Sequence, residues 1–319
     1  MSETMEGRRR GWLRYATRLL VGASLLTLLL SRTGTPDFGT QSGSRLVVGV
    51  GVAASLLLLG QAVAALRWKL VLGAGSPRWG YLARLYLIGS FFSLFLPTVV
   101  GGDVLRAAAA AKATRRPGGV IASVVIDRAL GVLALLGYAL AGLFLAPDLR
   151  QRLAEVVRLR LPTAGVIVAV LTGVAAAALG ARFAWRSRRV REAAQDAKAA
   201  AADLIRAPRT LAAAILLGVV VQGLYILLWL VLALVVRLPV PPTTLLLGVP
   251  IVSLLAMLPV TLNGLGVREG AWLVLLGGSG IAEASIVGFS LLFFATNLFT
   301  GLLGGFLFVV VGTGDEGKA

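Results

Sequence analysis

The sequence contains no cysteine and no histidine, and both absences narrow what the protein can do. Without cysteine there is no disulfide, no thiolate metal site and no thiol nucleophile. Without histidine, the usual general base at neutral pH and the commonest metal ligand are also missing. Most enzyme mechanisms lose their commonest side chains in this way, so we expect no catalytic centre, no metal site and no cofactor.

Charge is scarce and strongly biased toward one sign. Only 14% of the 319 residues are charged, and 31 basic residues against 14 acidic ones give a net charge of +17. Hydrophobic residues make up 58% of the chain and the mean hydropathy is +0.89, more than a soluble domain of this length needs for its core. These values predict an all-α polytopic membrane protein. Because the basic residues gather beside apolar runs, we expect them to face anionic lipid rather than nucleic acid.

Six apolar runs are long enough to cross a bilayer. They cover residues 12–30, 46–66, 120–146, 162–180, 211–236 and 281–311. Basic residues before the first run and after the second predict that both termini are cytoplasmic, in a single multi-pass domain (1–319) of the cell (inner) membrane. The alanine-rich basic segment 182–209 predicts an amphipathic helix lying on the cytoplasmic leaflet. The basic and aromatic group Arg67-Trp68-Lys69, with Trp79, Trp185 and Trp229, is typical of anchors at the membrane interface.

Two further apolar segments are short and interrupted, and they match each other at an offset of 162 positions. The matching residues are Leu96-Pro97 with Leu258-Pro259, Gly102 with Gly264, and Arg106 with Arg268. Each segment predicts a re-entrant helical hairpin with a hinge at its proline, Pro97 or Pro259. Irregular backbone at such depth is tolerated only where protein or a wet cavity covers it.

The elements around the two hairpins have the same order in each half of the chain: two spans, a hairpin and one span. The first repeat covers residues 12–146 and the second covers 162–311. Three complete spans separate the hairpins, so the hairpins enter the membrane from opposite sides. This order predicts an inverted-topology repeat, an arrangement in which secondary transporters bind their substrate near the midplane. The closely spaced glycines Gly301, Gly304 and Gly305 in the last span favour tight helix packing.

Charged residues inside the apolar segments are candidates for a binding site, because an unpaired charge in hydrocarbon costs several kcal/mol. Among them three arginines face two acids, and a guanidinium binds phosphate oxygens bidentately. The glycine-rich turns also leave helix N-termini with free N–H groups inside the membrane. The expected substrate-binding residues are Arg106, Asp127, Arg128, Arg268, Glu269, Gly101, Gly102, Asn263 and Gly264.

A purely structural interpretation of the same charges remains open. Asp127 could pair with Arg268, or Arg106 with Glu269, and so lock the hairpins together without binding anything. Asp103 could also serve as an N-cap and occupy some of the free N–H groups.

Three motifs occur in an order that resembles a known family. They are Phe95-Leu96-Pro97 to Gly101-Gly102 and Arg106, then Val124-Val125-Ile126-Asp127-Arg128 with Gly131, then Leu258-Pro259 to Gly264-Leu265-Gly266-Val267-Arg268-Glu269. Over residues 46–311 the sequence is similar to the membrane domain of lysylphosphatidylglycerol synthase/flippase proteins and their stand-alone, flippase-like relatives. The resemblance implies a translocator of lipids or lipid-linked molecules, with the five charged candidates at matching positions. Asp127 stands where many relatives carry glutamate. The full synthases add an aminoacyl-transferase domain after the membrane part, so for a chain ending at Ala319 lysyl transfer is not expected.

The leading functional prediction is the flipping of an anionic phospholipid or a polyprenyl-phosphate-linked lipid between leaflets. Arg106 and Arg268 would hold the phosphate, while Asp127 and Glu269 would orient these arginines. Two alternatives stay open: an integral-membrane transferase acting on a lipid phosphate, and a membrane scaffold whose basic helix recruits partners. The sequence leaves open whether the protein forms a homo-oligomer.

Overall fold

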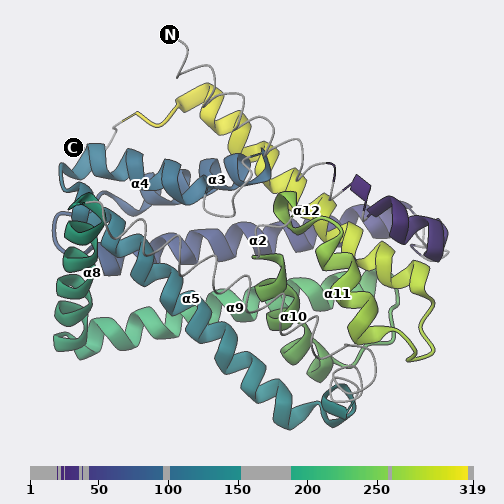
Figure 1. Ribbon diagram of the computed structural model, residues 1–319. Coiled ribbons are helices and arrows are strands. Elements are labelled where there is room, and N and C mark those ends of the chain that lie inside the picture. The colour runs from purple at the N-terminus through teal and green to yellow at the C-terminus, as the bar shows by residue number, and fades with distance from the viewer. Residues whose placement is uncertain are drawn as a thin grey trace.

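The computed structural model describes residues 20, 23–24, 26–35, 38, 43–95, 101–151, 188–257 and 261–314, and every regular element in these ranges is a helix (Figure 1). The two predicted hinges at Pro97 and Pro259 lie outside the described residues. So do the predicted span 162–180 and most of the predicted span 12–30.

Four of the described helices are long and apolar enough to cross a membrane. They are α2 (Gly43–Leu72), α5 (Pro117–Leu145), α9 (Pro208–Val235) and α12 (Glu283–Val311). They correspond to four of the six predicted spans. Helix α2 continues six residues beyond the predicted end at Leu66, because the first break in its helical pattern is the turn that begins at Gly73.

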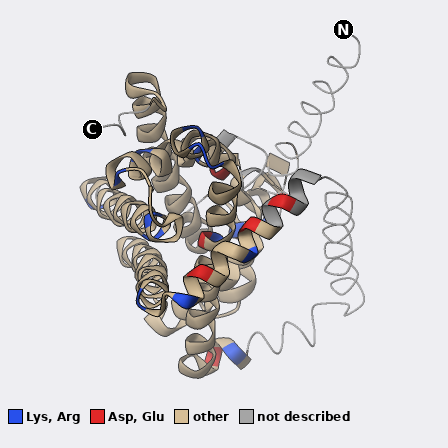
Figure 2. Ribbon diagram, turned by 90° about the vertical axis from the view of Figure 1, so that its left-hand side faces the viewer, with Lys and Arg blue, Asp and Glu red and all other residues tan. Residues whose placement is uncertain are grey.

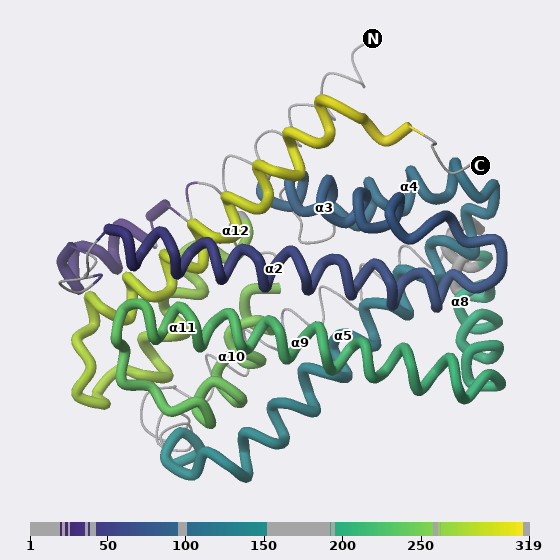
Figure 3. Tube along the Cα trace, turned by 180° about the vertical axis from the view of Figure 1, so that it is seen from behind, coloured from purple at the N-terminus to yellow at the C-terminus, as the bar shows by residue number. Residues whose placement is uncertain are grey.

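Two pairs of shorter helices pack as hairpins. The first pair is α3 (Trp79–Phe95) and α4 (Gly101–Thr114), and the second is α10 (Pro242–Ala256) and α11 (Val267–Leu276), joined by the short η1 (Leu262–Gly264). Gly102 lets α4 approach α3 closely, since a Cβ at this position would collide with the carbonyl oxygen of Gly89. Figures 1 and 3 place the two hairpins toward opposite ends of the bundle.

The two halves of the chain contact each other in a reciprocal way. Helices α2 and α9 run antiparallel and pack along each other, while α3 packs on α12 and α10 packs on α5 (Figure 3). Close approaches to the partner backbone occur at two glycines 162 positions apart: Gly142 of α5 lies against Leu247 of α10, and Gly304 of α12 lies against Leu87 of α3. Gly301 and Gly305 also lie directly on α3, so the predicted tight packing of these glycines is confirmed.

The hydrophobic core of the second half is built around aromatic rings. Trp229 stacks on Phe293 with 4.6 Å between ring centroids and contacts Phe289 at 4.9 Å and Trp272 at 5.2 Å. Trp229 is therefore buried, and its predicted place at the membrane interface is wrong. Trp79 is nearly half exposed and its indole N–H donates to the carbonyl of Ala62.

Helix α8 (Arg188–Arg206) crosses the ends of α5 and α9 instead of running along them (Figure 1). Charged residues of both signs follow its length (Figure 2). It lies inside the segment 182–209 that the sequence predicts as amphipathic, and the cytoplasmic side assigned to that segment stays a prediction. The carboxylate of Asp196 faces Gly118 in the first turn of α5, where the helix dipole favours a negative charge.

Candidate functional site

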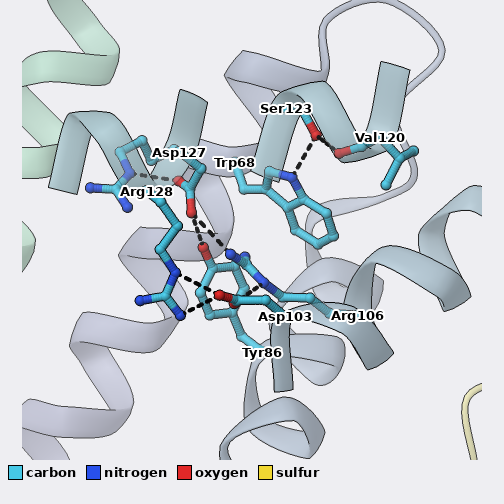
Figure 4. Close-up of polar contacts among 9 residues, drawn as sticks. Trp68, Tyr86, Asp103, Arg106, Val120, Ser123, Asp127 and Arg128 are labelled. Atoms are coloured by element: carbon cyan, nitrogen blue, oxygen red, sulfur yellow. Dashed lines mark hydrogen bonds and ion pairs between the residues drawn. The ribbon is translucent and has the colours of Figure 1, made fainter. Parts of the chain in front are cut away.

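Asp127 on α5 is the centre of a buried polar network in the first half. One carboxylate oxygen accepts a hydrogen bond from Nε of Arg67 at 2.8 Å. The other accepts from the hydroxyl of Tyr86 at 2.6 Å and from Nη2 of Arg106 at 3.2 Å (Figure 4). These donors come from α2, α3 and α4, so a single carboxylate joins four helices.

Asp103 in the first turn of α4 forms the second part of this network. Its Oδ1 accepts from Nε of Arg106 at 2.8 Å, and its Oδ2 accepts from Nε and Nη2 of Arg128, each at 2.6 Å (Figure 4). The interpretation of Asp103 as an N-cap is therefore wrong. Helix α4 begins at Gly101, which places Asp103 one helical turn from Arg106 and within reach of α5. Arg128 is the half-exposed member of the network.

Two aromatic rings enclose the guanidinium of Arg106. It lies 4.1 Å from the ring centroid of Tyr86 and 4.6 Å from that of Trp68, and cation–π attraction adds to the ion pairs in such a desolvated place. The indole of Trp68 is fixed by a 2.9 Å hydrogen bond to the hydroxyl of Ser123 (Figure 4). Arg106 is therefore immobilised by charge and by stacking.

The sequence interpretation missed Arg67, Trp68 and Tyr86 as parts of this network. Arg67-Trp68-Lys69 resembles the polar end of a span and predicts an interface position for Arg67 and Trp68, but both are buried. One feature of the sequence does indicate burial: no helix-breaking residue occurs before Gly73, so Arg67 and Trp68 belong to the helix α2 and not to a loop at its end. Tyr86 lies in the apolar helix α3, and the sequence of α3 does not indicate that the tyrosine hydroxyl contacts an acid on another helix.

Glu269 in the second half is fully buried and bound within its own half. Its Oε2 accepts from the backbone N–H of Gly266 at 2.6 Å, and its Oε1 accepts from the hydroxyl of Ser290 at 3.0 Å. The proposed pairs of Asp127 with Arg268 and of Arg106 with Glu269 are therefore wrong. Glu269 turns back to the start of α11, as an acid three residues after a helix cap does, and Asp127 is occupied by donors of the first half.

Arg268 is the counterpart of Arg106 and has a different environment. It is 6% exposed, and its guanidinium lies 4.5 Å from the ring centroid of Phe293. Within the described part of the chain, neither its Nε nor its Nη1 has a hydrogen-bond partner. The side-chain amide nitrogen of Asn263, a residue held at φ 50°, also lacks a partner there. Each such buried donor costs about 1–3 kcal/mol if nothing satisfies it.

Both arginines line cavities that are open on one side, and these cavities adjoin. Arg268 and Asn263 line a cavity of about 290 Å³, and Arg106 and Asp127 line one of about 190 Å³. The two cavities share lining residues, among them Tyr86, Arg128 and Gln222. The other predicted site residues do not line them. Glu269 is bound to its own half, Gly101 and Gly102 lie in the first turn of α4, and Gly264 ends η1 with a positive φ.

The charges around the cavities do not balance. Arg67, Arg106 and Arg128 face Asp103 and Asp127 in the first half, which leaves one positive charge in excess. In the second half Arg268 stands next to Glu269 in sequence, but Glu269 is committed to Gly266 and Ser290. The region is therefore suited to attract one anion. Donors without a partner in the described residues lie on both sides: Nη1 of Arg67 and Nη1 of Arg106 in the first half, and Nε and Nη1 of Arg268 in the second.

The fold and this interior define a helical membrane protein with a polar, cationic cavity among its long apolar helices. More specifically, the chain belongs to the family described as the lysylphosphatidylglycerol synthase TM region, whose family model matches residues 15–305. This family is a membrane domain found in lipid-related proteins. No curated protein and no solved structure gives a significant match to the chain.

Proposed function

We propose that the protein moves an anionic lipid between the two leaflets by holding its head group in the adjoining cavities while its tails remain in the bilayer. The observation that carries this proposal is the guanidinium of Arg268, which is buried, faces a cavity and has two N–H groups without a partner in the described residues. A buried cation in that state requires a counter-ion, and a lipid phosphate supplies one with the geometry that arginine prefers.

Reciprocal packing of the halves supports an inverted repeat as the mechanical basis of transport. Gly142 against α10 and Gly304 against α3 are equivalent contacts at an offset of 162 positions. The ion pair between Arg67 and Asp127 links α2 to α5. At positions 162 residues further along the chain, a contact between two aromatic rings links α9 to α12. That second contact joins Trp229 and Phe289. Two similar halves with opposite orientation can tilt against each other and expose a midplane site to each side in turn.

The state of the carboxylates favours transport over the transferase alternative. A general base needs a free lone pair within reach of its substrate. Asp127, which lines the smaller cavity, already accepts from two guanidinium groups and a hydroxyl, and Glu269, which lines neither cavity, accepts from a backbone N–H and a hydroxyl. Their arrangement suits holding arginines and helix ends in place.

The test is a flipping assay with purified protein in liposomes. Fluorescent phospholipids with anionic head groups and polyprenyl-phosphate-linked lipids are placed in one leaflet, and their appearance in the other is followed. We expect faster transfer of at least one anionic lipid than in protein-free liposomes. Transfer of none of them would overturn the proposal.

A matched control separates the cavity from the general positive charge of the protein. Arg206 on α8 is 81% exposed and its nearest acid is 3.8 Å away, so Arg206→Gln removes a surface guanidinium only. We expect this variant to transfer lipid at the wild-type rate, whereas Arg268→Gln should transfer it at least tenfold more slowly. Equal losses in both variants would assign the effect to surface charge instead.

A further inference from the structure

The cavity of about 290 Å³, called the larger cavity below, contains polar groups without a hydrogen-bond partner, and these groups indicate which head group can bind there. Three kinds of atom are buried and lack a partner in the described residues: Nε and Nη1 of Arg268, Nδ2 of Asn263, and Oε1 of Gln61. All three residues line this cavity. The first two offer donors, which match phosphate oxygens, while Gln61 offers an acceptor, which needs an O–H or N–H on the ligand.

The charge of the cavity lining decides whether the ligand group that donates to Gln61 is a hydroxyl or an ammonium. No carboxylate lines the larger cavity, and its charged lining residues are Arg128 and Arg268. An ammonium group on the ligand would therefore meet like charges and no acid, which disfavours it. A hydroxyl group meets no such penalty, and the remaining polar lining consists of amides and hydroxyls: Gln61, Gln222, Asn263, Tyr86, Tyr225 and Ser253.

The charge of the site limits the charge of the ligand. Three buried arginines, Arg67, Arg106 and Arg268, are balanced by three buried acids, Asp103, Asp127 and Glu269, and the half-exposed Arg128, which lines both cavities, adds one positive charge. One negative charge neutralises this set. A phosphodiester carries one negative charge, whereas a phosphomonoester brings up to two near pH 7, because its second pKa is about 6.

The cavity size limits how much of the ligand is enclosed. About 290 Å³ lies at the lower end of ligand pockets, which run from about 300 to 1,000 Å³. A phosphate with a small polyol fits this space, while acyl or polyprenyl chains must stay outside.

We propose, building on the transport function above, that the substrate is a monoanionic lipid phosphodiester whose head group is uncharged and carries hydroxyl groups. Arg268 and Asn263 bind the phosphate, and Gln61 accepts a hydrogen bond from a head-group hydroxyl. Two sources share this chemistry: a glycerophospholipid with a glycerol head, and a polyprenyl monophosphate linked to a sugar.

The experiment measures flipping rates for a panel of lipids in liposomes that contain the full protein. Phosphatidylglycerol and a polyprenyl-phosphoryl hexose represent the two sources. Phosphatidylethanolamine supplies an amine, phosphatidic acid a monoester, and phosphatidylmethanol a monoanionic diester without a hydroxyl. We expect at least one of the first two lipids to move tenfold or more faster than the other three, and whichever one does so identifies the source.

The variant Gln61→Leu tests the hydroxyl contact directly. Because Oε1 of Gln61 has no partner among the described residues, leucine should leave the melting temperature unchanged. The advantage of the hydroxyl-bearing lipid over phosphatidylmethanol should fall to less than twofold. Arg268→Gln should instead slow both of these diesters at least tenfold, because it removes the phosphate contact.

The outcomes separate this inference from the function on which it rests. If all anionic lipids move at the same rate, or if phosphatidylethanolamine moves as fast as the hydroxyl-bearing lipids, the head-group assignment is wrong while lipid transport stands. Retention of the preference in Gln61→Leu would also contradict the assignment. If no lipid moves, the proposed function fails and this inference fails with it.

Discussion

Arg106 and Arg268 occupy matching positions in the two hairpins, yet the protein surrounds them differently. Around Arg106 the chain places two carboxylates and two aromatic rings. Around Arg268 it places the ring of Phe293 and a cavity. At the positions that correspond to Arg67 and Asp127, the second half carries Trp229 and Phe289, so an ion pair in one half becomes a ring contact in the other.

This difference indicates that two hairpins with matching sequence positions can serve different tasks. Neutralised charges at Arg106 hold α2, α3, α4 and α5 together, but they leave few free donors for a ligand. Aromatic packing holds α9, α11 and α12 together without using the guanidinium of Arg268, which remains available. We therefore assign stability mainly to the first arginine and binding mainly to the second.

The largest expected effect comes from removing the central acid of the first half. Asp127→Asn leaves Arg67 and Arg106 without their shared counter-ion while the shape of the side chain is kept. We expect a loss of about 3–5 kcal/mol in the free energy of unfolding, the usual cost of breaking a buried ion pair by removing one partner. Thermal unfolding in detergent measures this loss. Asp203→Asn, which changes an exposed acid, is the control, and equal stability of the two variants would contradict the role of the network.

A smaller effect is expected from filling two equivalent close contacts between the halves. Gly142→Leu and Gly304→Leu each place a side chain where the backbone of α10 or α3 lies, at a cost of about 1–3 kcal/mol from overpacking. Gly137→Leu on α5 is the matched control, because nothing described lies within 4 Å of a Cβ there. Comparable losses of melting temperature in Gly142→Leu and Gly304→Leu would support the equivalence of the two contacts. A loss of melting temperature in only one of these two variants would contradict that equivalence.

The smallest of the stability effects concerns the carboxylate of the second half. Ser290→Ala removes one of the two hydrogen bonds to Glu269 and keeps the one from Gly266. We expect a loss of about 1.5 kcal/mol, the lower end for a hydrogen bond to a charged group. Ser55→Ala, at an exposed serine bonded to its own helix, controls for the loss of a hydroxyl. An unchanged melting temperature for Ser290→Ala would mean that Glu269 does not depend on that contact.

Much of the fold could be predicted because its signals are local. Four spans are readable from long apolar runs, which correspond to helices of 28 to 30 residues, and the hairpins are readable from short apolar runs broken by proline and glycine. The offset of 162 positions was also visible in the sequence, since Gly102 and Arg106 recur as Gly264 and Arg268. Such features depend on neighbours in the chain, so they need no knowledge of how the helices pack.

The partners of the charged residues could not be predicted in the same way. Asp127 takes its donors from positions 67, 86 and 106, and which helix faces it depends on packing between segments far apart in sequence. The same limit explains why Trp229 was placed at the interface, although its ring stacks on Phe293, 64 positions further along the chain. Local composition shows that a charge is buried, while tertiary packing decides what neutralises it.

The central claim is tested most directly by Arg106→Gln and Arg268→Gln compared side by side in one detergent-to-liposome series. For each variant, the melting temperature and the rate of anionic lipid transfer are measured. We predict that Arg106→Gln lowers the free energy of unfolding by about 3 kcal/mol, because two buried acids lose a partner. Arg268→Gln should change it by less than about 1 kcal/mol and slow transfer at least tenfold, which is about 1.4 kcal/mol. A destabilised Arg268→Gln variant that still transfers lipid at the wild-type rate would contradict the account.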